Sequence, residues 1–222
     1  MSIVVSILTA TDLIHVSDLP PEGPRTLLLR HAPNATGLIT VLGESPPMPW
    51  VEAATTDPRT DALTLAQSLS DRAGVELDQD EPRAVFYAGW GRDIHGRDHH
   101  FRYLVANLDE EGGFKLTGES ITPDRVIKPH AEAAYSVQVV ATVDSAPTTR
   151  RRVEALPKAI RRGDMSAVAL EAATIVREIM HGPVLVVQLA PDGEVEAAIL
   201  DGDEVRTLAP AASKGTSRLV PG

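Results

Sequence analysis

Short runs of apolar and β-branched residues dominate the N-terminal part of the chain. Residues 3–8 and 13–16 have the composition of two neighbouring β-strands joined by a tight turn. Residues 26–29 and 38–42 form a second pair of such runs, and residues 33–37 between them are typical of a turn. This pattern predicts four short strands in succession.

A helical period follows the proline-rich residues 46–49, where the missing backbone donors make a helix implausible. Apolar positions recur at helical spacing across residues 62–73. Asp57 and Thr60 are alternative N-caps for this helix, and Gly74 stands where a C-terminal cap is expected.

Strand patterns return after this helix. They are expected at residues 84–88, 101–108, 113–116 and 135–143, with a hairpin turn at Gly112 and Gly113.

Two helices and a last group of strands complete the pattern. Residues 150–162 favour a helix that Pro157 starts anew or kinks, and residues 164–180 carry an uninterrupted apolar stripe. Three further strands are predicted at residues 183–189, 194–200 and 205–208. Residues 209–222 are rich in small residues and are expected to form a flexible tail, which leaves residues 1–208 as a single predicted domain.

The order of the elements is therefore strands, helix, strands, helices, strands. Two antiparallel sheets, each covered by helices on its outer face, satisfy this order. The sequence predicts an α+β fold, a four-layer αββα sandwich of two antiparallel sheets.

The composition narrows the classes of function. The chain has 222 residues and a formal net charge of −10, which argues against a groove for nucleic acid. It contains no cysteine, which excludes disulfides, thiolate metal sites and cysteine nucleophiles together. No apolar run approaches the length needed to cross a bilayer, and the N-terminus lacks the basic start of a signal peptide. We therefore expect a cytoplasmic protein that binds neither nucleic acid nor membranes.

Ser2 is the first candidate for chemistry because it directly follows Met1. Once Met1 is removed, the Ser2 hydroxyl can act as a nucleophile and its own α-amine as the general base, with an unperturbed pKa of about 8. The alternative is an ordinary first strand with a serine at its fraying end. His15 lies within the second predicted strand, where it either assists Ser2 or faces the core or solvent.

Several local phrases follow one known arrangement. Ser2 opens a strand, and Asp18 ends the second strand sixteen residues later. Gly43 lies in the phrase Thr-Val-Leu-Gly-Glu before the first predicted helix, and residues 84–90 and 182–187 match a later strand and a closing hairpin. With these phrases, most of the chain resembles proteasome β-type subunits and the related bacterial peptidase subunits of the N-terminal nucleophile hydrolase fold.

The resemblance implies a catalytic set of Ser2, Asp18, Arg25 and Gly43, in which the Gly43 N–H stabilises the oxyanion. The chain departs from the family at its catalytic lysine. No lysine precedes Lys115, and Arg25 is the nearest basic residue in the matching stretch. Arginine supplies positive charge there but keeps its proton.

Two uses of this fold stay open. In one, the chain is a proteasome-like subunit whose catalysis has diverged or been lost, which the missing lysine favours. In the other, Ser2 makes it an active N-terminal serine peptidase or amidohydrolase. The resemblance implies a homo-oligomer that stacks as rings, peptide or protein substrates if the chain is active, and an ATPase partner. It implies no cofactor.

A third hypothesis comes from a stretch rich in histidine and aspartate. Asp93, His95, Asp98, His99 and His100 crowd the predicted connection between two strands. Imidazole and carboxylate groups suit zinc or another divalent ion, and the step of four from His95 to His99 supports chelation on a helix. A solvated hairpin tip is the alternative interpretation of the same residues.

Overall fold

The computed structural model describes residues 1–9, 11–31, 35–44, 49–55, 61–78, 80–92, 98–108, 113–121, 136–143, 146–160, 165–208 and 215–218. The described strands form two antiparallel sheets of six strands each. The strands predicted from the sequence are confirmed in position, with ends that differ by a few residues.

The first sheet, called sheet A below, has the strand order β11-β10-β9-β2-β1-β8. Its strands are β1 (Ser2–Leu8), β2 (Leu13–Asp18), β8 (Ser136–Thr142), β9 (Val184–Leu189), β10 (Val195–Asp201) and β11 (Glu204–Leu208). β1 therefore lies between β2 and β8, and Ser2 at its start is paired with Thr142 at the end of β8.

The second sheet, called sheet B, has the strand order β12-β3-β4-β5-β6-β7. Its strands are β3 (Thr26–His31), β4 (Ala35–Leu42), β5 (Ala84–Arg92), β6 (Asp98–Ala106), β7 (Lys115–Ile121) and β12 (Gly215–Arg218). Thr26 on β3 is paired with Thr40 on β4.

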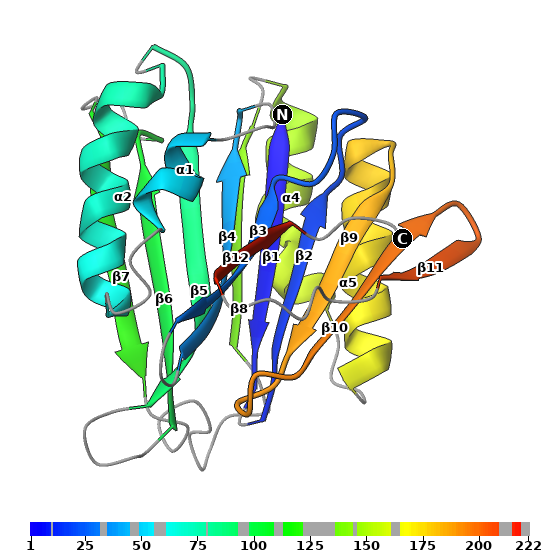
Figure 1. The fold of residues 1–222 in the computed structure, drawn as a ribbon. Coiled ribbons are helices and arrows are strands. Elements are labelled where there is room, and N and C mark those ends of the chain that lie inside the picture. Colours follow the sequence, from blue (N-terminus) through cyan, green and yellow to red (C-terminus); the bar gives the residue numbers. More distant parts are fainter. Residues whose placement is uncertain are drawn as a thin grey trace.

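The sheets pack face to face, and helices cover both outer faces (Figure 1). The helices α1 (Pro49–Ala54) and α2 (Ala62–Glu76) lie on sheet B, and α4 (Pro147–Ala159) and α5 (Met165–Met180) lie on sheet A. One apolar core fills the space between the sheets, and a separate core lies under each helical layer. The described elements thus form an α+β sandwich with two antiparallel sheets, as predicted.

β1 illustrates why the N-terminal strands are apolar throughout. Successive side chains of a strand point to opposite faces. Ile3, Val5 and Ile7 pack under α4 and α5, whereas Val4 and Leu8 pack between the sheets. Every residue of β1 is buried, so its sequence lacks the alternation of a half-exposed strand.

The first two helices correct the sequence interpretation in detail. A helix does begin in the proline-rich stretch, because Pro49 is the first residue of α1, where a missing N–H leaves no hydrogen bond unmade. The N-cap of α2 is Asp61, whose Oδ1 accepts hydrogen bonds from the backbone N–H groups of Leu63 and Thr64, both at 3.0 Å. Gly74 lies inside α2, which continues to Glu76, and is not its cap.

Other boundaries also differ from the prediction. Residues 35–37, which were predicted to be part of a turn, belong to β4, which begins at Ala35. Pro157 lies in the last turn of α4 without ending it. The flexible tail predicted at residues 209–222 needs correction for residues 215–218, which form β12 against the open edge of β3. Backbone pairing makes this strand, and its sequence carries no apolar pattern that signals it.

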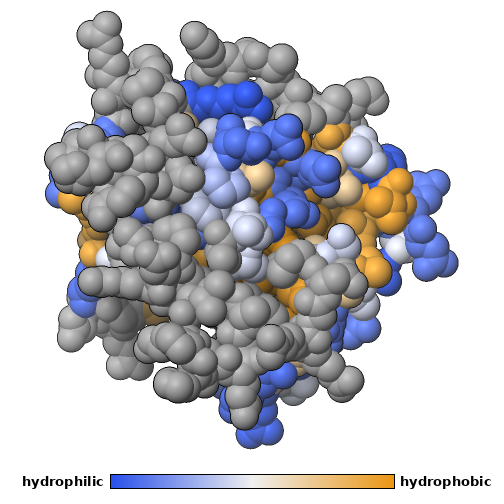
Figure 2. Space-filling view, turned by 90° about the horizontal axis from the view of Figure 1, so that it is seen from below, coloured by the Kyte–Doolittle hydropathy of each residue, from blue (hydrophilic) through white to orange (hydrophobic). Residues whose placement is uncertain are grey.

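Figure 2 shows the end of the sandwich opposite to the one where β1 begins. Among the residues coloured there, hydrophilic side chains are widespread, and apolar surface gathers on the side of β10 and α5. Within the described part of the chain, no helix has the length and apolar character required to cross a bilayer.

Candidate active site

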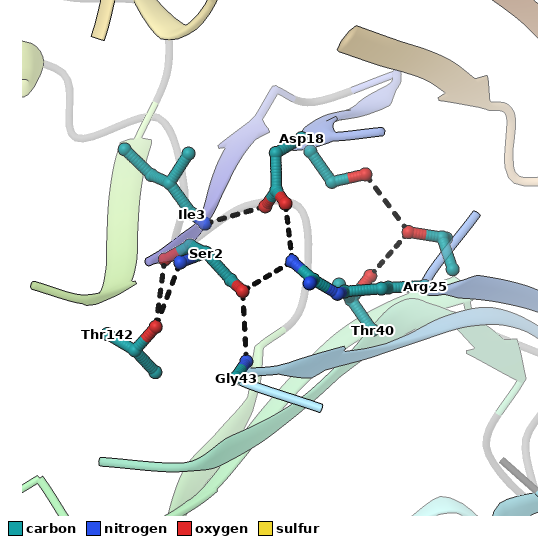
Figure 3. Close-up of polar contacts among 9 residues, drawn as sticks. Ser2, Ile3, Asp18, Arg25, Thr40, Gly43 and Thr142 are labelled. Atoms are coloured by element: carbon teal, nitrogen blue, oxygen red, sulfur yellow. Dashed lines mark hydrogen bonds and ion pairs between the residues drawn. The ribbon is translucent and has the colours of Figure 1, made fainter. Parts of the chain in front are cut away.

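The hydroxyl of Ser2 lies at the junction of the two sheets, where it accepts two hydrogen bonds. The backbone N–H of Gly43 lies 3.0 Å from Ser2 Oγ, and Arg25 Nη1 lies 2.5 Å from it (Figure 3). Ser2 itself belongs to sheet A, whereas Arg25 precedes the first residue of β3 and Gly43 follows the last residue of β4 in sheet B. Both donors therefore reach the hydroxyl from the opposite sheet.

Asp18, the last residue of β2, is held by two partners. Its Oδ1 accepts a hydrogen bond from the backbone N–H of Ile3 at 2.7 Å, and its Oδ2 forms an ion pair with Arg25 Nη1 at 2.5 Å. The side chains of Asp18 and Arg25 are 7% and 13% exposed, so water screens this pair little. Burial raises the pKa of the Asp18 carboxyl above its usual range, while the Ile3 N–H and the Arg25 charge act in the opposite direction.

Arg25 joins the carboxylate to the serine through one nitrogen. Nη1 of a guanidinium carries two hydrogens, and here Ser2 Oγ and Asp18 Oδ2 are its two acceptors. Because arginine remains protonated, this contact places a fixed positive charge against the serine oxygen and offers no base.

Gly43 occupies a backbone conformation that other residues adopt only with strain. Its φ is +83°, in the left-handed region. A Cβ at this position would lie 2.7 Å from the backbone oxygen of Pro82 and 2.9 Å from Cδ of Arg83. Only a glycine therefore lets the chain turn here and present its N–H to Ser2 without a clash.

Thr142 completes the surroundings of Ser2. Its Oγ1 accepts a hydrogen bond from the Ser2 backbone nitrogen at 2.9 Å and lies 3.5 Å from the Ser2 carbonyl oxygen. Sequence reasoning missed this residue, because 140 positions separate it from Ser2 and only the pairing of β1 with β8 brings them together. Its own surroundings in the sequence, a β-branched strand, carry no signal of such a role.

His15 does not contact Ser2. Its side chain is fully buried between the sheets, where Nε2 lies 2.7 Å from Thr40 Oγ1 and the ring stacks on Phe86. Burial lowers the pKa of His15 to about 3, so the imidazole is neutral at physiological pH. Of the two interpretations of His15, the structure favours a core position.

His99 and His100, two of the three histidines of the metal hypothesis, do not point to a common site. His99 and His100 are neighbours on β6, so their side chains point to opposite faces of sheet B. The His100 ring packs against Trp90, and its Nε2 lies 3.0 Å from the carbonyl oxygen of Thr9. The His99 ring lies near Phe101. His95 lies outside the described residues, among which no group of three or more metal-binding side chains occurs.

Comparison with known proteins does not assign a function to the chain. No family model matches the chain, and no curated protein matches its sequence. Among solved structures, the chain is similar to Anbu from Hyphomicrobium sp. strain MC1, with 12% sequence identity and a TM-score of 0.48, over 91% of this chain and 87% of that one. A similarity at this level adds nothing to the interpretation of the residues around Ser2.

Proposed function

We propose that the chain is an N-terminal serine hydrolase of the N-terminal nucleophile class, which cleaves amide bonds in peptides with Ser2 as nucleophile. The observation that carries this proposal is the pair of donors on Ser2 Oγ, the Arg25 guanidinium and the Gly43 N–H. A buried serine in an ordinary strand has no need of a positive charge and a glycine amide on the same oxygen.

The mechanism requires a free α-amine on Ser2, so the Met1–Ser2 peptide bond must first be cleaved. The amine, with an ordinary pKa of about 8, then takes the hydroxyl proton as Oγ attacks the carbonyl carbon of the substrate. The Gly43 N–H stabilises the resulting oxyanion. The amine returns the proton to the leaving nitrogen as the C–N bond breaks, and a water molecule activated by the same amine hydrolyses the acyl-enzyme.

Arg25, Asp18 and Thr142 have supporting roles in this mechanism. The Arg25 charge stabilises negative charge as it develops on Ser2 Oγ, and Asp18 holds the guanidinium in place. Thr142 Oγ1, 2.9 Å from the Ser2 nitrogen, accepts one amine hydrogen and so leaves the nitrogen lone pair for the hydroxyl proton.

The state of Met1 decides whether the site can work. Met1 is 42% exposed, but Ser2 is 1% exposed and its nitrogen is bound to Thr142. The bond between them is therefore poorly accessible to an aminopeptidase after folding, and its cleavage is expected before β1 enters the sheet.

The test is direct labelling of Ser2. The protein is released from a fusion that leaves Ser2 as its first residue and is treated with an acylating β-lactone probe, and adducts are located by intact-mass measurement and peptide mapping. We expect one adduct, on Ser2, and none in Ser2→Ala or in the protein that keeps Met1. A folded, Ser2-terminated protein that forms no adduct at millimolar probe would overturn the proposal.

A second candidate is a proteasome-like subunit that assembles without catalysis. Arg25 favours it, because it is the nearest basic residue in the stretch where the resembled family has its catalytic lysine, and it forms an ion pair with Asp18 at 2.5 Å. This candidate keeps the homo-oligomeric ring and the ATPase partner as its function. Mass photometry of the intact chain tests it, since a stable monomer at micromolar concentration contradicts an assembling subunit.

A further inference from the structure

Four buried polar side chains form a hydrogen-bonded chain directly behind the site. His15 Nε2 lies 2.7 Å from Thr40 Oγ1, which lies 2.8 Å from Thr26 Oγ1. Thr26 Oγ1 lies 3.1 Å from Ser17 Oγ. All four residues are at most 1% exposed. Figure 3 shows the contacts of Thr40 beside the site residues.

The chain crosses twice between the sheets. His15 and Ser17 are two residues apart on β2 of sheet A and so share one face. Thr26 and Thr40 are paired residues of β3 and β4 in sheet B. The bonds from His15 to Thr40 and from Ser17 to Thr26 therefore join β2 to the two strands opposite it.

Each hydroxyl of this chain lies close in sequence to a residue of the site. Ser17 directly precedes Asp18, Thr26 directly follows Arg25, and Thr40 is three residues before Gly43. These neighbours share short, regular backbone segments, so a shift of one member displaces the site residue beside it.

The position of one sheet relative to the other decides whether the site exists. Ser2 and Asp18 belong to sheet A, while Arg25 and Gly43 flank strands of sheet B. Most of the interface between the sheets is apolar. Apolar packing is non-directional, but hydrogen bonds are restricted to a narrow range of distance and angle. Polar groups buried there lose their bonds, without replacement by water, if one sheet slides along the other.

His15 is suited to end such a chain. Because the imidazole is neutral, its burial between the sheets avoids the cost of an isolated charge. Its Nδ1 has no hydrogen-bond partner among the described residues. In the tautomer with the proton on Nε2, only a lone pair at Nδ1 lacks a partner. His15 then donates a hydrogen bond to Thr40, Thr40 donates to Thr26, and Thr26 donates to Ser17.

We propose that His15, Thr40, Thr26 and Ser17 are positioning residues that lock β2 to β3 and β4, so that Arg25 and the Gly43 N–H stay within hydrogen-bond distance of Ser2 Oγ. The consequence for catalysis rests on the proposed function of Ser2. The geometric consequence, a fixed contact between Gly43 and Ser2, does not.

The test compares variants that differ by one hydroxyl. Thr40→Val and Ser17→Ala each break the chain, whereas Thr40→Ser keeps the hydroxyl. Ser6→Ala is the matched control, because Ser6 is equally buried on the adjacent strand and its Oγ has no hydrogen-bond partner among the described residues. For each variant, amide hydrogen exchange is measured by NMR at Gly43 and at Val5 in the middle of β1, together with the rate of Ser2 acylation by the β-lactone.

We expect Thr40→Val to raise the exchange rate at Gly43 about tenfold and to lower acylation by a similar factor. Exchange at Val5 should stay within about twofold of wild type, and Thr40→Ser and Ser6→Ala should resemble wild type at both amides. If Thr40→Val does not fold, Ser17→Ala, which removes only the end of the chain, carries the same expectation.

Two results would overturn the proposal. Unchanged exchange at Gly43 in a folded chain-breaking variant shows that the four residues do not hold the sheets in register. An equal rise at Gly43 and Val5 shows that they support overall stability and not the site. If wild type is not acylated, the proposed function fails, while the exchange rates still decide whether the positioning role is correct.

Discussion

Arg25 Nη1 lies 2.5 Å from Ser2 Oγ and donates its second hydrogen to Asp18 Oδ2, also at 2.5 Å. A permanent cation therefore touches the oxygen that would attack a substrate. In water such a contact is weak, but at a buried site the same charge acts strongly on a neighbouring group that becomes negative.

Two substitutions of Arg25 distinguish the contribution of its charge to the acylation rate from that of its shape. Arg25→Met removes the charge and leaves the buried Asp18 without its ion pair, so we expect Ser2 acylation to fall about 100-fold. Arg25→Lys keeps the charge but presents a single ammonium, and we expect a loss of no more than about tenfold. Acylation rates of the Ser2-terminated variants, measured as a function of pH, check this. A wild-type rate for Arg25→Met would mean that the guanidinium has no part in activating Ser2.

Gly43 and Gly74 form a matched pair of glycine-to-alanine tests. Gly43→Ala forces a side chain into a left-handed backbone conformation and against Pro82, so we expect a loss of about 1–3 kcal/mol in the free energy of unfolding. Gly74→Ala lies within α2, where the new Cβ would meet no atom within 4 Å apart from its chain neighbours and the backbone of its own helix, and we expect a gain of about 0.5–1 kcal/mol. Urea unfolding of both variants gives the two values. Equal effects at the two positions would contradict the strain assigned to Gly43.

Thr142 is expected to affect catalysis by the Ser2 α-amine and not the stability of the fold. Thr142→Val keeps the shape of the side chain but removes the acceptor that orients the Ser2 nitrogen, so acylation should slow about tenfold. Thr142→Ser should restore most of the rate. The midpoint of thermal unfolding of both variants serves as the control, because a parallel loss of rate and stability in Thr142→Ser would indicate a packing role.

Acid should destabilise the protein through its buried histidines. Burial lowers the pKa of His15 and of His100 to about 3, from an ordinary value of 6.5. Between these values the unfolded chain binds more protons than the folded one, so stability falls as the pH is lowered from about 6.5 towards 3. Each buried histidine contributes up to about 1.4 kcal/mol per pH unit in this range.

Asp18 acts with the opposite sign in a narrower range. Burial raises the pKa of its carboxyl, so from pH 3.8 upwards to this raised pKa the folded protein binds the proton more tightly than the unfolded chain. This offsets part of the histidine effect near pH 4. Urea unfolding between pH 7 and pH 4 measures the sum, and His15→Gln should make the dependence on pH less steep. An unchanged slope in His15→Gln would show that His15 does not remain neutral in the folded protein.

Much of the fold could be predicted because its elements are encoded locally. Composition indicates the apolar strands β1 and β9, and helical spacing of apolar residues indicates α5. The structure has these elements where they were expected. The prediction missed α1, whose starting proline looks like a helix breaker, and β12, whose Gly-Thr-Ser-Arg sequence has no strand pattern. A proline at the first position of a helix gives no warning in the sequence, and β12 depends on pairing with β3, far away in the chain.

The candidate site was predictable only in part, for the same reason. Ser2 and Asp18 have the spacing of the resembled family, and Arg25 and Gly43 were named only through that resemblance; the structure brings all four together. Thr142 could not be named, because nothing near it in the sequence marks it.

The sequence by itself determined most of the strands and helices, because hydrophobic period is a local property. It also placed a serine at the start of the first strand and an aspartate at the end of the second, because residue type is local too. Only the tertiary structure decided that Ser2 and Asp18 from one sheet meet Arg25 and Gly43 from the other, and that His15 belongs to the core. Contacts between sheets depend on strand order, on register and on the relative position of two packed layers. These are set by the simultaneous packing of the whole chain, and no stretch of residues specifies them alone.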